Sequence, residues 1–453
     1  MKLFFPLLLL CASIKVLANQ ALVHQDAHET NCLDIAQDWQ NLAQAQAQTQ
    51  GAYRFANEQG PLTYPIEQNE LFSVYIAKTK AIINSRNIRA QQPCPILTPV
   101  AKAQGYTTEQ LTVSDLIAPF ELRQPNHERA ILLIHGLTDS PFTFHYLGAV
   151  FHQQGYNVRA MLLPGHATAP SDLNLVDLNH WQNTIDYAIT RTAKDFEQFA
   201  IMGYSTGAAL AIARVAKSPP ENLSAMALIS PASEPHNKHG WLAKWIARVP
   251  FVEWIDEDAD FDFAKYESFS WRAAALADEA MNLLEHVYLP KELPLFSAFS
   301  EVDSTIDSTA NLAMLNRFAK DTHQLDNHIL YYFGNPQTAI VQLPDGYKIL
   351  QPACTHAVCD KVIDMSHVGI LQPPSHPYYG YKGIYRSCGG YLSDLTKYLE
   401  CKQHSAPLLG ERTKSNMSHA VPLQRLTFNP AYDDFTYRLS NFLNDAMPPH
   451  VQP

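Results

Sequence analysis

Basic residues are scarce in this chain of 453 residues. Lys and Arg together number 33, against 44 Asp and Glu, and the formal charge is −11 at pH 7. The first eighteen residues carry Lys2 and Lys15 but no acid, so removing them changes the charge from −11 to −13. The remainder has no basic run that could follow a phosphate backbone. We therefore expect no nucleic acid among the partners of this protein.

A long apolar run is also missing from the N-terminus. The run from Leu3 to Ile14 is shorter than the roughly 20 residues that a membrane-spanning helix needs. It follows Lys2 and leads to Val16-Leu17-Ala18, which together have the pattern of a secretory signal peptide. We predict a signal peptide over residues 1–18 with cleavage after Ala18. The mature chain would then be periplasmic or secreted, without a transmembrane segment.

The cysteines lack the Cys-x-x-Cys spacing that is typical of zinc sites. Six of them follow Ala18, and an even number in an exported chain favours disulfides. Six cysteines allow fifteen connectivities. Pairing of nearest neighbours is the simplest: Cys32 with Cys94, Cys354 with Cys359, and Cys388 with Cys401. We expect no metal and no cofactor.

Two helices are expected before residue 105. Residues 33–50 are rich in Gln and Ala, and residues 70–89 place apolar side chains at a spacing near 3.6. Three prolines then interrupt the pattern between residues 93 and 99. We interpret residues 19–104 as a helical N-terminal extension that lies on the main domain and carries no visible chemistry.

From Gly105 onward, strand and helix patterns alternate. The segment 129–136 contains a continuous apolar run, as expected of a strand buried on both faces of a parallel sheet. Such alternation predicts the α/β class: a mostly parallel, doubly wound sheet with helices on both faces. We assign residues 105–453 to this domain, with a closing helix near 433–445. Ligands of such sheets bind beyond the carboxyl ends of the strands.

Three segments interrupt the alternation. Residues 236–292 contain Trp241 and Trp245 and an acidic patch, and we interpret them as a cap. Residues 323–352 suggest an inserted β-meander, turned at Asn335-Pro336 and at 345–346. Residues 373–427 form an insertion with two cysteines. The cap tryptophans could line an acyl-binding site, although they could equally form the core of the cap.

The segment 200–210 contains the strongest motif of the chain. It is an apolar run, then Gly203-Tyr204-Ser205-Thr206-Gly207, then a helical run of small residues. A sharp turn from strand to helix needs glycine on both sides of the serine and leaves its hydroxyl exposed. The Thr206 N–H would lie at a helix N-terminus, where it could stabilise an oxyanion. Alone, the motif could be an ordinary junction with a surface serine.

Suitable partners for Ser205 follow in the expected order. Asp303 ends a predicted strand, and His367 follows the last predicted strand, 361–365. Asp307 is the competing acid, but it precedes Ser308-Thr309 and could cap a helix. The competing histidines, His356 and His376, lack a position at a strand end. We expect two further histidines, His135 and His166, to bond the backbone near the site.

Several motifs resemble the monoacylglycerol lipase, lysophospholipase and carboxylesterase branch of the α/β-hydrolase superfamily, together with its serine aminopeptidase-like members. They are Leu132 to Thr138, Leu163 to His166, Gly203 to Gly207, Ser300 to Asp307 and Ser366 to Val368. The resemblance covers residues 110–371 and the last helix. It implies a cap after the sixth strand, and it assigns the second oxyanion N–H to Leu137. It does not cover the N-terminal extension, the β-meander or residues 373–427.

The sequence thus predicts an exported serine hydrolase that cleaves carboxylic esters through an acyl-enzyme. Ser205 is the nucleophile, His367 the base and Asp303 the orienting acid. The substrate would be a small-molecule ester with a medium or long acyl chain, of monoacylglycerol or lysophospholipid type. Two alternatives stay open: an aminopeptidase of the proline iminopeptidase type, whose amine site could come from residues 256–262, and a non-catalytic binding module of the same fold.

Overall fold

The computed structural model of this protein describes residues 31–37, 52–57, 60–258, 260–319, 328–343, 347–403 and 407–449. The predicted signal peptide, most of the helix expected over 33–50 and the first residues of the expected β-meander lie outside this part. The described chain contains no helix that is long and apolar enough to cross a membrane.

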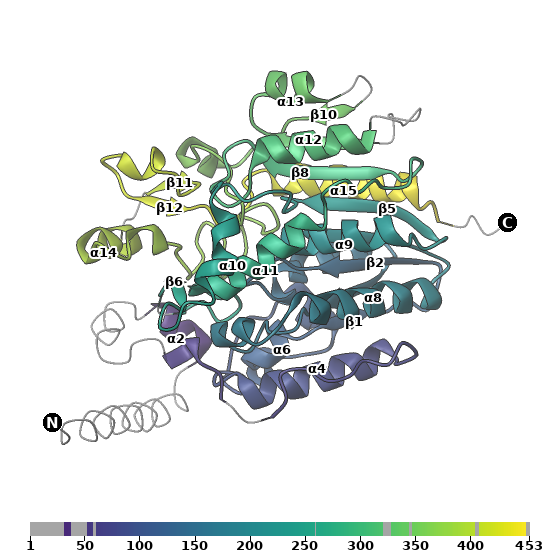
Figure 1. Cartoon of the computed structure of the whole chain (residues 1–453), viewed down its shortest axis with the longest axis horizontal. Coiled ribbons are helices and arrows are strands. Elements are labelled where there is room, and N and C mark those ends of the chain that lie inside the picture. Colours follow the sequence, from purple (N-terminus) through teal and green to yellow (C-terminus); the bar gives the residue numbers. More distant parts are fainter. Residues whose placement is uncertain are drawn as a thin grey trace.

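An eight-stranded sheet organises the molecule (Figure 1), with the order β1-β3-β2-β4-β5-β8-β9-β10. Only β1 runs antiparallel to its neighbour. The strands are β1 (Phe120–Leu122), β2 (Arg129–Ile134), β3 (Asn157–Met161), β4 (Gln198–Tyr204), β5 (Leu223–Ile229), β8 (Leu295–Ser300), β9 (Ile329–Phe333) and β10 (Lys348–Leu350). The predicted class, a mostly parallel α/β sheet, is confirmed.

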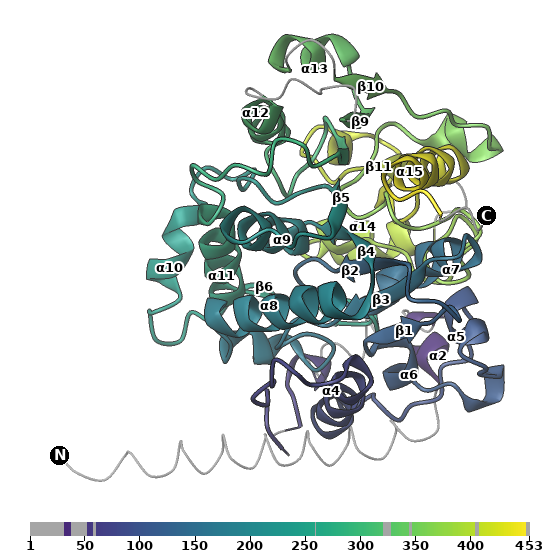
Figure 2. The ribbon, with the colours of Figure 1, turned by 90° about the vertical axis from the view of Figure 1, so that its right-hand side faces the viewer.

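Helices cover both faces of this sheet (Figure 2). On one face pack α8 (Leu178–Asp195), α9 (Thr206–Lys217), α11 (Trp271–Asn282) and α12 (Ser308–Ala319); on the other pack α7 (His145–Gln153) and α15 (Tyr432–Ala446). Strand residues alternate between the two cores: in β2, Leu132 faces the first and Leu133 the second. Because both faces are buried, the strands appear in the sequence as continuous apolar runs.

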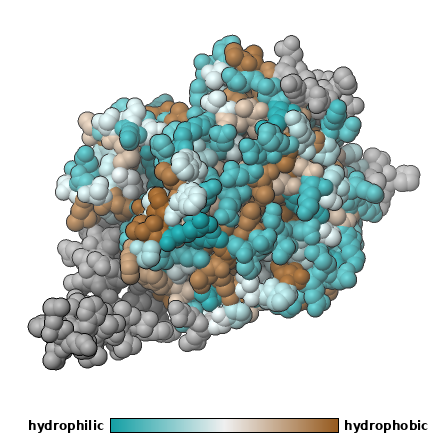
Figure 3. Space-filling view, in the orientation of Figure 1, coloured by the Kyte–Doolittle hydropathy of each residue, from teal (hydrophilic) through white to brown (hydrophobic). Residues whose placement is uncertain are grey.

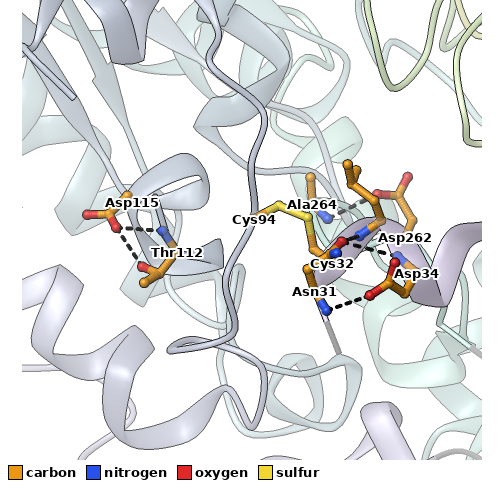
Figure 4. The surroundings of a disulfide bond; sticks show 9 residues. Asn31, Cys32, Asp34, Cys94, Thr112, Asp115, Asp262 and Ala264 are labelled. Atoms are coloured by element: carbon orange, nitrogen blue, oxygen red, sulfur yellow. Dashed lines mark hydrogen bonds between the residues drawn. A yellow bond between two sulfur atoms is a disulfide. The ribbon is translucent and has the colours of Figure 1, made fainter. Parts of the chain in front are cut away.

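The segment before residue 105 packs against the α/β body. Its described helices are α2 (Cys32–Gln37), α4 (Phe72–Arg86) and α5 (Pro99–Ala103), so the helix expected over 70–89 is confirmed. A third hydrophobic core joins this segment to the predicted cap and to the insertion at 373–427, since it includes Cys32, Phe263 and Tyr378. Figure 4 shows the Cys32–Cys94 disulfide close to Asp262 and Ala264 of the predicted cap, and, further off, the Thr112–Asp115 bonds that begin α6 (Val113–Ile117). The boundary near residue 104 stays a prediction.

The predicted β-meander is wrong. Residues 336–342 form a helix, α13 (Pro336–Gln342), where a strand was expected. The strands on either side, β9 and β10, are parallel neighbours in the main sheet. Asn335-Pro336 begins the helix instead of turning a hairpin, because the Asn335 side chain accepts a hydrogen bond from Gln337 N–H and Pro336 occupies the first helical position. A parallel pair needs such a crossover.

The last predicted strand is also wrong. Residues 357–361 form a 3-10 turn, and Val362 contributes only an isolated bridge to Leu409. The edge beside β9 is already occupied by β10, so the chain reaches His367 through a loop.

The segment predicted as a cap lies between β5 and β8. It contains the turn Gly240–Leu242, α10 (Ala243–Ile246), the strand pair β6 (Trp254–Asp256) and β7 (Phe269–Ser270), and α11. The insertion at 373–427 contains the turn Gly389–Tyr391, α14 (Leu395–Gln403), β11 (Leu408–Gly410) and β12 (Leu423–Arg425). Nearest-neighbour pairing of the cysteines is confirmed for all three disulfides.

Candidate active site

Ser205 occupies the tight turn between β4 and α9. Its backbone has φ 52° and ψ −119°, an uncommon conformation for a residue with a side chain. A Cβ at Gly203 would lie 2.5 Å from Ala208 Cα, and one at Gly207 would lie 2.4 Å from the Ile134 carbonyl oxygen. Both glycines are therefore required by close backbone packing, as the motif predicted.

His367 links the other two predicted residues. Its Nδ1 lies 2.7 Å from Asp303 Oδ2, and its Nε2 lies 3.0 Å from Ser205 Oγ. A carboxylate can only accept, so we assign the ring proton to Nδ1, which leaves Nε2 to accept from the Ser205 hydroxyl. The side chains of His367 and Asp303 are 5% and 1% exposed. The structure thus brings the three predicted side chains into one hydrogen-bonded chain.

The two predicted oxyanion donors flank Ser205. A Cβ at Gly136 would lie 3.0 Å from Ser205 Cβ, so the backbone just before Leu137 packs against the serine. The Thr206 N–H is at the N-terminus of α9. Within the described chain, neither the Leu137 nor the Thr206 N–H has a hydrogen-bond partner. Their role as oxyanion donors stays a prediction.

The competing acid has the helix-capping role that its neighbours suggested. Asp307 Oδ1 accepts hydrogen bonds from Thr309 and Ala310 N–H at the start of α12, at 2.8 and 3.0 Å. Asp303 also orders its own loop, since its Oδ1 accepts from Thr305 and Ile306 N–H. These two bonds orient the Asp303 carboxylate, so that Oδ2 points at His367.

The remaining histidines have other partners. His135 Nε2 accepts from Leu163 N–H and its Nδ1 lies 2.8 Å from the Gly136 carbonyl, while His166 Nδ1 lies near the Leu163 and Pro164 carbonyls. Burial lowers the pKa of His135 to about 4 and that of His166 to about 3. Both bond the backbone near the site, as predicted, and their lowered pKa values favour the neutral form. His356 lies near Asp433, and His376 Nδ1 accepts from backbone N–H groups.

Trp241 and Trp245 lie on the surface of the segment around α10. Their exposed fractions are 51% and 55%, and Arg248 stacks against the Trp245 ring. Four further exposed apolar residues follow them in the sequence: Val249, Phe251, Val252 and Ile255. In Figure 3, hydrophobic residues (brown) gather in the region where Figure 1 labels α10 and β6. A cavity of about 610 Å³ lies beside this surface, lined in part by Val249, Trp254 and Arg272. A role of these tryptophans in substrate binding stays a prediction.

The acidic patch at residues 256–262 is largely buried and paired. Asp260 accepts from Ser268 and from Glu267 N–H, and Asp262 accepts from the Tyr379 hydroxyl. Burial, followed by the nearby Glu267 carboxylate, raises the pKa of Asp262 to about 7. These carboxylates hold the segment together, so the observation that suggested an amine-binding site has a structural explanation.

Sequence reasoning did not single out Glu411, which contacts the backbone of His367. Glu411 lies in the insertion at 373–427, and its carboxylate accepts from the His367 N–H at 2.9 Å. Nothing in the local sequence marks this residue, because its partners come from distant segments. Across the described ranges, no group of three or more His, Cys, Asp or Glu is placed to hold a metal.

Part of the chain matches a known protein family. Residues 125–257 match the family described as serine aminopeptidase, S33. Among solved structures, the chain is similar to one from a study of two metagenome-derived lipolytic enzymes, LipS and LipT (18% identity, 48% of this chain and 87% of that one, TM-score 0.40). It is also similar to a monoglyceride lipase from Saccharomyces cerevisiae (15%, 48% and 82%, TM-score 0.38) and a monoacylglycerol lipase from Paleococcus ferrophilus (15%, 52% and 88%, TM-score 0.36).

The family match adds to two structural observations that point the same way. The order of the parallel strands places the Ser205 turn near the middle of the sheet, at the carboxyl end of β4. The glycines of that turn meet backbone atoms that leave no room for a side chain. These observations and the family match over residues 125–257 agree on an α/β-hydrolase fold.

Proposed function

We propose that this protein is an exported serine hydrolase that cleaves carboxylic esters through an acyl-enzyme. The observation that carries the proposal is the hydrogen-bonded chain from Asp303 through His367 to Ser205. A serine hydroxyl is a weak nucleophile at neutral pH, so it needs a base within hydrogen-bond reach and a group that orients the base. The two contacts in this chain, at 2.7 and 3.0 Å, support this assignment of the three roles.

The reaction follows from these positions. Ser205 Oγ attacks the ester carbonyl while its proton passes to His367 Nε2. The Leu137 and Thr206 N–H groups bind the oxyanion of the tetrahedral intermediate, and Asp303 stabilises the imidazolium. The C–O bond to the alcohol then breaks, and His367 returns the proton to the leaving oxygen. Water, deprotonated by the same histidine, attacks the acyl-enzyme and releases the acid and free Ser205.

An ester of a medium or long acyl chain is the proposed substrate class. The exposed apolar residues around α10 support it, because a polar ester would gain little from such a surface (Figure 3). The alternative of an aminopeptidase loses support, since the carboxylates of Asp260 and Asp262 already have internal partners. A non-catalytic binding module would not need the Ser205–His367–Asp303 chain.

Export is part of the proposal. The three disulfides suit an oxidising compartment, such as the periplasm or the cell exterior. The signal peptide that would direct export lies at residues 1–18, outside the described residues.

A fluorophosphonate probe tests the catalytic part of this proposal. We expect the probe to label the mature wild-type protein and the Ser218→Ala variant, whose altered serine is an exposed residue at the end of α9. Ser205→Ala should not be labelled. Aryl esters of increasing chain length should then be hydrolysed, and an aminoacyl-arylamide should not. Labelling that is independent of Ser205 would refute the proposal, and cleavage of the arylamide alone would favour the peptidase.

A further inference from the structure

The buried carboxylate of Glu411 bridges the two loops that carry Asp303 and His367. One oxygen, Oε2, accepts from the His367 N–H at 2.9 Å. The other, Oε1, accepts from the Ser304 hydroxyl at 3.0 Å. Ser304 directly follows Asp303 and lies 62 positions before Ser366, the neighbour of His367. A single side chain therefore fixes the acid loop and the base loop relative to each other.

Arg425 holds this carboxylate in place. Its guanidinium contacts both oxygens of Glu411, through Nε at 2.7 Å and Nη2 at 3.0 Å. The same Nη2 donates to Thr305 Oγ1 at 3.0 Å, which adds a second contact to the acid loop. A planar guanidinium that contacts both carboxylate oxygens restrains orientation as well as position.

The insertion at 373–427 provides both partners. Strands β11 and β12 are parallel, and Gly410 pairs with Arg425. Glu411 directly follows Gly410, so the pairing brings it next to Arg425. The Cys388–Cys401 disulfide anchors the neighbouring α14, and Gln424 Nε2 donates to the Cys401 carbonyl. The insertion thus places Glu411 and Arg425 in contact with the loops that carry His367 and Asp303.

The charge of Glu411 is strongly favoured at this position. The residue is fully buried, and burial by itself would raise its pKa. The Arg425 guanidinium and the hydrogen bonds from His367 and Arg412 N–H outweigh burial and lower the pKa to about 2. A charged acceptor, stronger than a neutral one, therefore holds the His367 backbone.

We infer that Glu411, fixed by Arg425, is a positioning residue that sets the geometry between His367 and Asp303. This inference rests on the proposed function, because it assigns a role in the same site. Glu411 does not touch Ser205, and it acts through the backbone of the base and the loop of the acid. Loss of the Glu411 carboxylate would displace His367 and Asp303, which must stay within hydrogen-bond reach of each other.

Kinetics of three variants test the inference. Ser304→Ala removes one contact to Glu411, Thr305→Val removes one contact to Arg425, and Glu411→Gln removes the charge. Misplacement of about 1 Å can cost a factor of roughly 100 in rate. We expect kcat on an aryl ester to fall about 3-fold for Ser304→Ala and Thr305→Val, and about 10- to 100-fold for Glu411→Gln. KM should stay within about 2-fold in each. The concentration of folded protein is measured by circular dichroism.

A matched control separates positioning from stability. Arg86, at the end of α4, and Asp172, in the α/β body, form another buried ion pair. The double variant Arg86→Met with Asp172→Leu should leave kcat per folded molecule within about 2-fold of wild type. If Glu411→Gln behaves like this control, with wild-type kcat in its folded fraction, the inference is wrong.

A measurement without substrate keeps the inference separate from the proposed function. The His367 Nδ1–H, held by Asp303, should give a low-field proton resonance in the nuclear magnetic resonance spectrum of the wild type. Asp303→Asn identifies the signal by abolishing it. Glu411→Gln and Ser304→Ala should shift or broaden it, whether or not esters are cleaved. An unchanged resonance in both variants would overturn the inference, while an inactive wild type would refute only the proposed function.

Discussion

Arg86 and Asp172 form a two-point ion pair that ties α4 to the α/β body. Arg86 Nε lies 2.8 Å from Asp172 Oδ2, and Arg86 Nη2 lies 2.5 Å from Asp172 Oδ1. Their side chains are 7% and 1% exposed. Removing one partner leaves a buried charge without compensation, whereas removing both does not. We predict that Arg86→Met lowers the free energy of unfolding by about 3 to 5 kcal/mol, measured by urea denaturation.

The double variant Arg86→Met with Asp172→Leu is the control for the single variant Arg86→Met. We expect this variant to recover most of the lost stability, because apolar residues of similar volume can replace a buried pair at little cost. Equal destabilisation in the single and the double variant would contradict the assigned role of the charge.

Asp303 and Asp307 offer a comparison of two acids four residues apart. Asp303→Asn would leave the His367 tautomer unsupported, so we predict a fall in kcat of roughly 10³ to 10⁴ with little change in stability. Asp307→Asn keeps a side-chain oxygen that can cap α12 and should retain activity. Asp307→Ala should cost about 1 kcal/mol of stability. Ester hydrolysis and thermal melting of all three check this, and full activity in Asp303→Asn would contradict the assignment.

Gly207→Ala should fail for a steric reason. The new Cβ would lie 2.4 Å from the carbonyl oxygens of Ile134 and His135, which belong to the neighbouring strand end. Backbone cannot move away as a flexible side chain can, so we predict a loss of more than about 3 kcal/mol. The reverse exchange in the same helix, Ala216→Gly, should cost only about 1 kcal/mol. Similar melting temperatures for the two variants would contradict the packing at the turn.

Reduction of the disulfides should destabilise the protein, and the effect should follow loop length. Cys32 and Cys94 are 62 positions apart and Cys388 and Cys401 are 13 apart. Loop-closure entropy predicts losses of about 4 and about 3 kcal/mol when each pair is replaced by serine. Denaturation of the oxidised wild type and the two paired variants measures this. Identical curves for reduced and oxidised wild type would show that the disulfides do not support the fold.

The pH dependence of stability should report on Glu411. Its folded pKa of about 2 lies below the ordinary value of 4.5, so the unfolded chain binds the proton more readily. The resulting stability, on the order of 3 kcal/mol, is fully present above pH 4.5 and is lost as the pH falls toward 2. We predict that Glu411→Gln is less stable than wild type at pH 6 and that the difference shrinks toward pH 2.5. A constant difference across this range would contradict the lowered pKa.

The sequence by itself determined the local parts of the site. Glycines on both sides of Ser205 are required wherever a strand turns this sharply into a helix, so the motif predicts its own geometry. The run 130–134 is apolar at successive positions because alternate side chains of β2 pack into the two cores on opposite faces of the sheet. The order of Ser205, Asp303 and His367 along the chain then indicated which side chains would meet.

Only the tertiary structure decided the contacts between distant segments. Asn335-Pro336 is compatible with both a hairpin turn and a helix start, and the parallel pairing of β9 with β10 selects the helix. The acidic residues near 260 could have bound a ligand, but burial against Tyr379 gives them a structural role. Glu411 contacts the His367 backbone from the end of β11, which pairs with β12. Such contacts depend on which surfaces pack together, and local sequence carries no signal for that.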